Sequence, residues 1–117
     1  MIEPCPWSEA RPRLGDTIEP GAAEIDEEIA TGQARAWRVF GGRLYMVTRV
    51  ECGTNGQELV IIAARGRDMV RAIDEIKRRA ASRGIKSVRF HTQSAAFGRL
   101  AQRYGFSEAE RVYRVKV

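Results

Sequence analysis

The sequence is poor in the side chains on which metal centres and disulfide frameworks depend. Its 117 residues contain two cysteines, Cys5 and Cys52, and one histidine, His91. The two cysteines are far apart in the chain and match no metal-binding or redox spacing. We therefore expect two free thiols, no disulfide framework and no zinc site. The residue pattern also indicates no catalytic triad and no metal cluster.

Long apolar segments are lacking as well. The longest apolar run, Leu59–Ala64, is far shorter than the roughly 20 residues that a membrane-spanning helix needs. The N-terminus has no basic segment followed by an apolar one, as a secretory signal would have. We therefore expect a soluble, cytoplasmic protein without membrane contacts. The length suits one hydrophobic core, which predicts a single domain over residues 1–117, as a monomer or a homodimer.

Acidic and basic residues are unevenly distributed along the chain. Residues 1–33 have a net charge of −6, whereas residues 34–117 have a net charge of +11. A basic surface favours a polyanion, which leaves three partners open: the phosphates of a nucleotide cofactor, a nucleic acid or an acidic protein. Seventeen of the twenty basic residues are arginine, so the excess also fits a solvated surface without a partner.

The pattern of apolar residues predicts a mixed α/β order. Residues 2–5 are expected to form a short strand, followed by helices over Ser8–Ile18 and Ala22–Ala30. Three antiparallel strands, separated by a Gly-Gly break and an Asn-Gly turn, are expected over Ala34–Phe40, Leu44–Val50 and Glu58–Ala64. The last of these is apolar over most of its length, as in a central strand covered on both faces.

The rest of the chain predicts a crossover connection. Asp68–Arg83 has apolar residues at helical spacing, and Ser87–Gln93 alternates as a strand does. A strand, a long helix and another strand form a right-handed crossover, so Glu58–Ala64 and Ser87–Gln93 should be parallel neighbours. A helix over Ser94–Tyr104 and a final strand over Glu110–Val117 are expected to complete the chain.

This order of elements resembles the GNAT superfamily of acyl-CoA N-acyltransferases. Val60–Arg67, an apolar strand ending in Arg-Gly-Arg before a helix, is similar to the family's acyl-CoA motif. Ser94–Phe106, a helix followed by Gly-Phe, is similar to the segment that closes the family's cofactor site. The resemblance implies a GNAT-like mixed sheet, with antiparallel N-terminal strands, a parallel pair at its centre and helices on both faces. It also implies acylation of an amine with acetyl-CoA or another acyl-CoA.

The resemblance further implies which residues hold the cofactor. A pyrophosphate binds a helix N-terminus because unpaired N–H groups point at it, and glycine lets the backbone come close. By this pattern the cofactor-binding residues are Ile62, Ala63, Arg65, Gly66, Arg67, Asp68, Met69, Val70 and Ser94. Asp68 stands where the motif has its first glycine and Val70 where it has glycine or alanine. An aspartate there is expected to cap the helix with its own side chain.

Catalytic candidates are few. Acyl transfer needs a base for the amine and a donor for the developing oxyanion. Glu58 and its hairpin neighbour Glu51 are candidate bases, and His91 is a candidate acid or base. By the resemblance, Ala101 occupies the position of the family's usual tyrosine acid. Two functions stay open: a GNAT-like N-acyltransferase, or a non-catalytic GNAT-like phage protein with a structural, virion-associated or nucleic-acid-linked role.

Overall fold

The computed structural model describes residues 1–90. Its elements are β1 (Ile2–Pro4), α1 (Trp7–Leu14), the 3-10 helix η1 (Gly15–Ile18), α2 (Ala22–Thr31), β2 (Arg35–Val39), the 3-10 helix η2 (Phe40–Gly42), β3 (Leu44–Gly53), β4 (Gly56–Gly66), α3 (Met69–Ser82) and β5 (Ser87–Phe90). The predicted helix Ser94–Tyr104, the predicted strand Glu110–Val117 and residues 91–93 lie outside the described residues.

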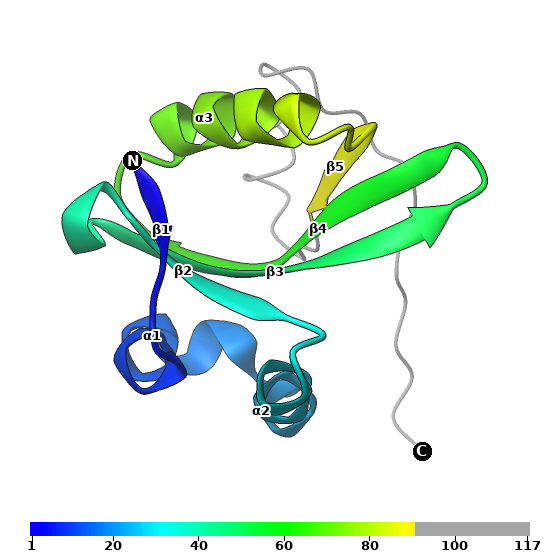
Figure 1. Ribbon diagram of the computed structural model, residues 1–117. Coiled ribbons are helices and arrows are strands. Elements are labelled where there is room, and N and C mark those ends of the chain that lie inside the picture. The colour runs from blue at the N-terminus through cyan, green and yellow to red at the C-terminus, as the bar shows by residue number, and fades with distance from the viewer. Residues whose placement is uncertain (91–117) are drawn as a thin grey trace.

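A mixed sheet forms the middle layer of the described part of the chain. Its strands lie in the order β1-β2-β3-β4-β5. The first four pair antiparallel, whereas β4 and β5 pair parallel. One face of the sheet is covered by α3 and the other by α1 and α2 (Figure 1). The predicted fold is therefore confirmed: β4 lies between β3 and β5, and α3 connects the two parallel strands.

An apolar core lies on each face of the sheet. The core under α1 and α2 includes Leu14 and Val47, and the core under α3 includes Ile61 and Ile76. All four side chains are buried. Burial of an aliphatic side chain of this size contributes about 1.5–3 kcal/mol. These two cores explain why the sequence of β4 is apolar on both of its faces.

A β-bulge interrupts β4 at Ile62. In the β3–β4 register, Val47 faces Ala63 and Thr48 faces Ile61, so Ile62 has no partner on β3. The side chains of Ile62 and Ala63 consequently pack toward the same core instead of alternating between the faces. Within the described residues, the pairing of β4 with β5 reaches as far as Ile61, immediately before the bulge.

The first helix is shorter than the predicted Ser8–Ile18. It ends at Leu14, and the 3-10 helix η1 continues the chain. Gly15 has a φ of 56°, in the left-handed region that glycine enters without steric cost, and this conformation ends the α-helix. The Thr17 hydroxyl donates a hydrogen bond of 2.6 Å to the Leu14 carbonyl oxygen, which satisfies one acceptor of the helix end.

Both cysteines are free thiols, as predicted. Cys5 is half-buried and Cys52 is exposed. Burial, followed by the charge of nearby Glu9, raises the pKa of the Cys5 thiol, which disfavours the reactive thiolate. Among residues 1–90, no helix combines the length and the apolar character that crossing a membrane requires.

Asp26 of α2 joins the two helices on the same face of the sheet. Its Oδ1 accepts hydrogen bonds from Trp7 Nε1 and Arg11 Nε, both of 2.7 Å, and its Oδ2 accepts one of 2.9 Å from Arg11 Nη2. The bonds from Arg11 and then from Trp7 lower the pKa of Asp26 from its ordinary 3.8 to about 2. The folded state thus favours the charged carboxylate. The contact stabilises the protein above about pH 4 and loses its effect as the pH falls toward 2.

We expect Asp26→Asn to lower the melting temperature at pH 7, with a difference from the unmodified protein that shrinks between about pH 4 and pH 2. The reason is that acid protonates Asp26 and so makes the unmodified protein resemble the variant. Thermal unfolding followed by circular dichroism from pH 7 to pH 2 measures the difference. Asp74→Asn, at an exposed position of α3, is the control. A difference for Asp26→Asn that stays constant across this range contradicts the role assigned to the carboxylate.

Candidate functional site

The segment Arg65–Asp68 connects the C-terminal end of β4 to α3. Gly66 has a φ of 143°, and a Cβ atom there would lie 2.2 Å from the Arg43 carbonyl oxygen and 2.6 Å from Leu44 Cα. The backbone N–H of Arg67 donates a hydrogen bond of 2.7 Å to the same Arg43 carbonyl. A side chain at position 66 therefore has no room, and the backbone of this loop lies directly against the start of β3.

Asp68 occupies the N-cap position of α3, but its side chain does not cap the helix. The predicted capping role is wrong, because the side chain makes no capping hydrogen bond. A capping residue usually has an extended backbone, whereas Asp68 has a left-handed one with φ 65° and ψ 34°. Its Oδ2 instead accepts a hydrogen bond of 2.9 Å from Arg43 Nη1. The first-turn N–H groups of α3 are thus not occupied by this carboxylate.

A pocket of about 580 Å³ lies beside this loop. The residues that line it are Pro12, Arg13, Gly42, Arg43, Tyr45, Arg65, Gly66 and Arg67. Half of these are arginines, and none of the lining residues within 1–90 is acidic. Guanidinium groups bind phosphate and carboxylate oxygens through paired hydrogen bonds. The lining therefore favours an anionic ligand.

The four arginines reach this pocket from distant parts of the chain. Arg13 belongs to α1 and lies over the Tyr45 ring, with Cζ 5.4 Å from the ring centroid. Arg65 Nη1 lies 3.6 Å from a carboxylate oxygen of the exposed Asp16. Arg67 is exposed and has no ion-pair partner within residues 1–90. The sequence pattern predicted Arg65 and Arg67, but Arg13 and Arg43 were missed because only the fold brings them here.

Tyr45 contributes a ring to the pocket, but its hydroxyl group faces another partner. The hydroxyl donates a hydrogen bond of 2.8 Å to Glu9 Oε2. This bond, followed by burial and the charge of Glu9, raises the pKa of Tyr45. Glu9 is in turn held by Arg38 Nη1, at 2.7 and 2.9 Å from its two oxygens. Tyr45 is therefore a neutral anchor for α1, and this structure does not present it as an acid.

The apolar residues predicted for the site differ in where their side chains lie. Ile62 and Ala63 pack toward the core under α1 and α2, and Met69 packs toward the core under α3. Val70 is half-buried in the first turn of α3. These residues can therefore serve a ligand chiefly through their backbone groups. The predicted site residues His91 and Ser94 lie outside the described residues.

Glu58, a predicted base, belongs to an ion-pair network across β3, β4 and β5. Its Oε1 lies 3.2 Å from Arg89 Nε, and its Oε2 accepts a hydrogen bond of 2.8 Å from the Ser87 hydroxyl. Arg89 Nη2 also donates a bond of 2.8 Å to Glu51, which accepts another of 3.3 Å from Arg49 Nε. Arg89 therefore bridges the two carboxylates that the sequence singled out.

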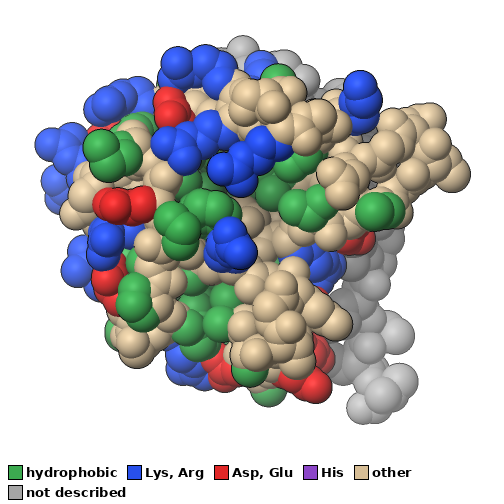
Figure 2. All heavy atoms as spheres, in the orientation of Figure 1, with side chains coloured by type: hydrophobic (Ala, Val, Ile, Leu, Met, Phe, Trp, Pro, Cys, Tyr) green, Lys and Arg blue, Asp and Glu red, His purple; other side chains and the backbone are tan. Residues whose placement is uncertain are grey.

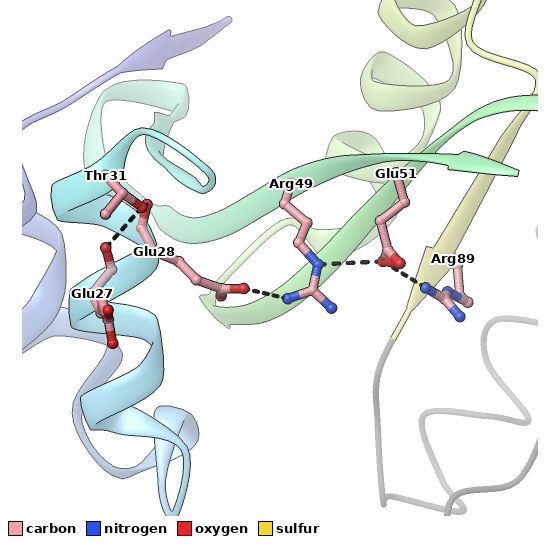
Figure 3. A network of polar contacts seen from close by, with 6 residues as sticks. All are labelled: Glu27, Glu28, Thr31, Arg49, Glu51 and Arg89. Atoms are coloured by element: carbon pink, nitrogen blue, oxygen red, sulfur yellow. Dashed lines mark hydrogen bonds and ion pairs between the residues drawn. The ribbon is translucent and has the colours of Figure 1, made fainter.

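The network continues from the sheet to α2 (Figure 3). Arg49 lies between Glu51 and Glu28, and its Nη1 donates a hydrogen bond of 2.7 Å to Glu28. Partial burial acts to raise the pKa of Glu51, but the hydrogen bonds and charges of Arg49 and Arg89 outweigh it and lower the pKa. A carboxylate with a lowered pKa is a weak proton acceptor at neutral pH, so Glu51 is a poor candidate base.

Among the comparisons with known proteins, only the comparison of three-dimensional structures finds matches. No family model matches the sequence, and a search of curated proteins finds no match. The chain is similar in structure to a ribosomal-protein-alanine N-acetyltransferase from Brucella melitensis biovar Abortus 2308, with 16% identity, a TM-score of 0.68 and coverage of 100% of this chain and 99% of that one. It is also similar to an acetyltransferase from Trypanosoma brucei, with 14% identity, a TM-score of 0.65 and coverage of 100% and 99%.

A third similar structure is an aminoglycoside N-acetyltransferase, AAC(6')-Iy, in complex with CoA, with 15% identity, a TM-score of 0.63 and full coverage of both chains. The chain has a GNAT-like fold. Within this GNAT-like fold, the arginine-lined pocket lies beside the segment Val60–Arg67, which resembles the family's acyl-CoA motif. At sequence identities this low, the structural similarity establishes the fold alone and does not identify a ligand.

The left-handed backbone of Asp68 gives a prediction about stability. We expect Asp68→Gly to be at least as stable as the unmodified protein, and Asp68→Ala to be less stable than Asp68→Gly by about 1 kcal/mol. Both variants lose the exposed ion pair with Arg43, which contributes little. Only glycine adopts a φ of 65° without steric cost. Urea unfolding of the three proteins gives the comparison, and equal stability of the two variants contradicts the left-handed conformation.

Proposed function

We propose that this chain is a GNAT-like N-acyltransferase, which transfers an acyl group, in the simplest case acetyl, from acyl-CoA to an amine. The arginine-lined pocket beside Arg65–Asp68, in a chain with a GNAT-like fold, is the observation that carries the proposal. The similarity to a structure that contains CoA supports the same ligand here. Acyl-CoA supplies the activated thioester carbonyl and the thiol that leaves.

The residues at this pocket suit the phosphates of CoA. The four arginines offer several charge-assisted hydrogen bonds, each stronger than a bond between neutral groups. The N-terminus of α3 begins at Met69, and its free N–H groups and helix dipole favour negative charge. The ion pair between Asp68 and Arg43 offsets the negative charge that Asp68 brings to the same place. These groups bind and orient the ligand.

The bulge at Ile62 suits the reacting end of the same ligand. Ile62 has no partner on β3, and we propose that its backbone N–H serves the ligand. A donor aimed at a carbonyl oxygen stabilises the negative charge that develops there during acyl transfer. We assign this task to the backbone at Ile62 and Ala63, which lies on β4 before the loop that binds the phosphates.

Removal of a proton from the amine is assigned to Glu58 or His91. Ser87 and Arg89, both on the neighbouring strand β5, hold the Glu58 carboxylate of β4 in a fixed orientation. A carboxylate held in this way accepts a proton from an ammonium group that approaches within hydrogen-bonding distance. His91 follows β5 directly in the sequence, and histidine is the side chain that most often serves as a general base.

A second candidate function is a non-catalytic GNAT-like protein retained for binding or assembly, such as a virion-associated phage protein. Two observations favour it. Both candidate carboxylates, Glu51 of β3 and Glu58 of β4, are engaged by arginines. Asp68 also places a carboxylate at the loop where the phosphates would bind.

Calorimetric titration with CoA and acetyl-CoA tests the pocket. We expect saturable binding, weakened about tenfold in Arg67→Gln because a hydrogen bond to a charged group contributes about 1.5 kcal/mol or more. Arg78→Gln is the matched control, since Arg78 lies on α3 and pairs with Glu75 outside the pocket. If the unmodified protein does not bind CoA at millimolar concentration, the proposal is wrong.

Thiol release from acetyl-CoA distinguishes the two candidate functions. With a panel of amines that includes peptides, polyamines and aminoglycosides, an enzyme releases CoA thiol in the presence of its acceptor. In that case Glu58→Gln should lower kcat by about a hundredfold and leave CoA affinity unchanged, because a general base acts on the amine. Glu51→Gln is the control at the neighbouring carboxylate. Tight CoA binding without turnover on any amine supports the non-catalytic protein.

A further inference from the structure

A second pocket, of about 520 Å³, lies between the C-terminal half of α3 and the sheet. Its apolar lining includes Trp37, Met46, Leu59, Ile76 and Ile85, and its basic lining consists of Arg35, Arg49, Arg79 and Arg83. It shares no lining residue with the first pocket, and none of its lining residues within 1–90 is acidic. Hydrophobic side chains below α3, with Lys and Arg side chains around them, are visible on this face in Figure 2.

The floor of this pocket offers hydrocarbon contact. Trp37 Nε1 donates a hydrogen bond of 2.8 Å to Thr48 Oγ1, so the one polar atom of the indole is already satisfied within the protein. Met46 and Ile76 are buried, and Leu59 is half-buried. A hydrocarbon chain placed on this floor displaces water from apolar surface without leaving a polar group of the indole unpaired.

The arginines at the rim differ in how far they are neutralised. Arg79 pairs with Glu75 and donates a hydrogen bond of 2.8 Å to the Ile2 carbonyl, and Arg49 belongs to the ion-pair network of β3. Arg35 and Arg83, in contrast, have no carboxylate partner within residues 1–90. Arg35 contacts the Trp37 ring, with Cζ 5.7 Å from the ring centroid. Two guanidinium charges thus remain available at the edge of an apolar floor.

We propose that this pocket binds a single-chain amphiphile with an anionic head group, of the class of medium-chain fatty acids. The alkyl chain lies on the floor formed by Trp37, Leu59 and Ile76, and the head group meets Arg35 and Arg83. The volume falls within the range of about 300–1,000 Å³ that is typical of small-molecule sites. Residues from β2, β3, β4 and α3 surround this space, a concave shape that suits a small molecule better than a helix of another protein. The proposal is independent of acyl transfer at the first pocket.

Decanoate is the probe for the unmodified protein, with binding followed by calorimetry and by Trp37 fluorescence against a Trp37→Phe reference. Saturable binding is expected, and it should tighten up to about fourfold for each methylene added in undecanoate and dodecanoate. Decanol and decyltrimethylammonium, which have the same chain with a neutral or cationic head, should bind at least tenfold more weakly. Equal binding of all three head groups, absence of binding, or capture of an acidic peptide in preference to decanoate overturns the proposal.

Variants locate the bound probe. Arg35→Gln and Arg83→Gln should each weaken decanoate binding several-fold and leave decanol binding unchanged, because only the head group loses a partner. Arg78→Gln, on the same helix but outside the pocket, and Arg67→Gln, in the first pocket, should bind decanoate as the unmodified protein does. Melting temperatures show whether each variant is folded. Unchanged decanoate affinity in a folded Arg35→Gln, Arg83→Gln double variant overturns the assignment.

Discussion

The burial of β4 on both of its faces is the constraint on which the rest of the structure depends. Val60 and Ile61 are fully buried, on a strand with neighbours on both sides. Removing a side chain of this size from such a position typically costs about 2–5 kcal/mol. In this structure α1 and α2 cover one face of β4 and α3 covers the other, and α3 also connects β4 to its parallel neighbour β5.

Because β4 is fixed in this manner, the loop at its end is fixed as well. Gly66 brings the loop against the start of β3, and Asp68 turns the chain into α3 with a left-handed backbone. The guanidinium groups of Arg13, on α1, and of Arg43, which directly precedes β3, then reach the same pocket. The basic lining of this pocket is thus a property of tertiary packing, in which the local motif supplies only two of the four arginines.

The contrast between local sequence patterns and tertiary packing explains how much could be predicted from the sequence. Periodicity and turn residues predicted the order of the strands, the antiparallel pairing of β2, β3 and β4 and the parallel pairing of β4 with β5, since apolar patterns and turn signals mark these elements. The bulge at Ile62 could not be predicted, because a continuous apolar segment has the same sequence pattern with or without an unpaired residue. The predicted capping role of Asp68 was wrong. Asp68 has a left-handed backbone and its side chain makes no capping hydrogen bond, and the residue type alone does not determine this backbone conformation. Arg13 and Arg43 were missed because their convergence is nonlocal.

The order of strands in the sheet bears on how the chain is made. Each strand from β2 to β5 lies beside the strand that precedes it in the sequence. During synthesis, every new strand therefore emerges from the ribosome when its partner has already been translated, and few contacts must wait for distant segments. Two of the links between consecutive strands contain helices: α1 and α2 lie between β1 and β2, and α3 lies between β4 and β5. Assembly of the described part of the sheet can thus proceed from the N-terminus in step with translation.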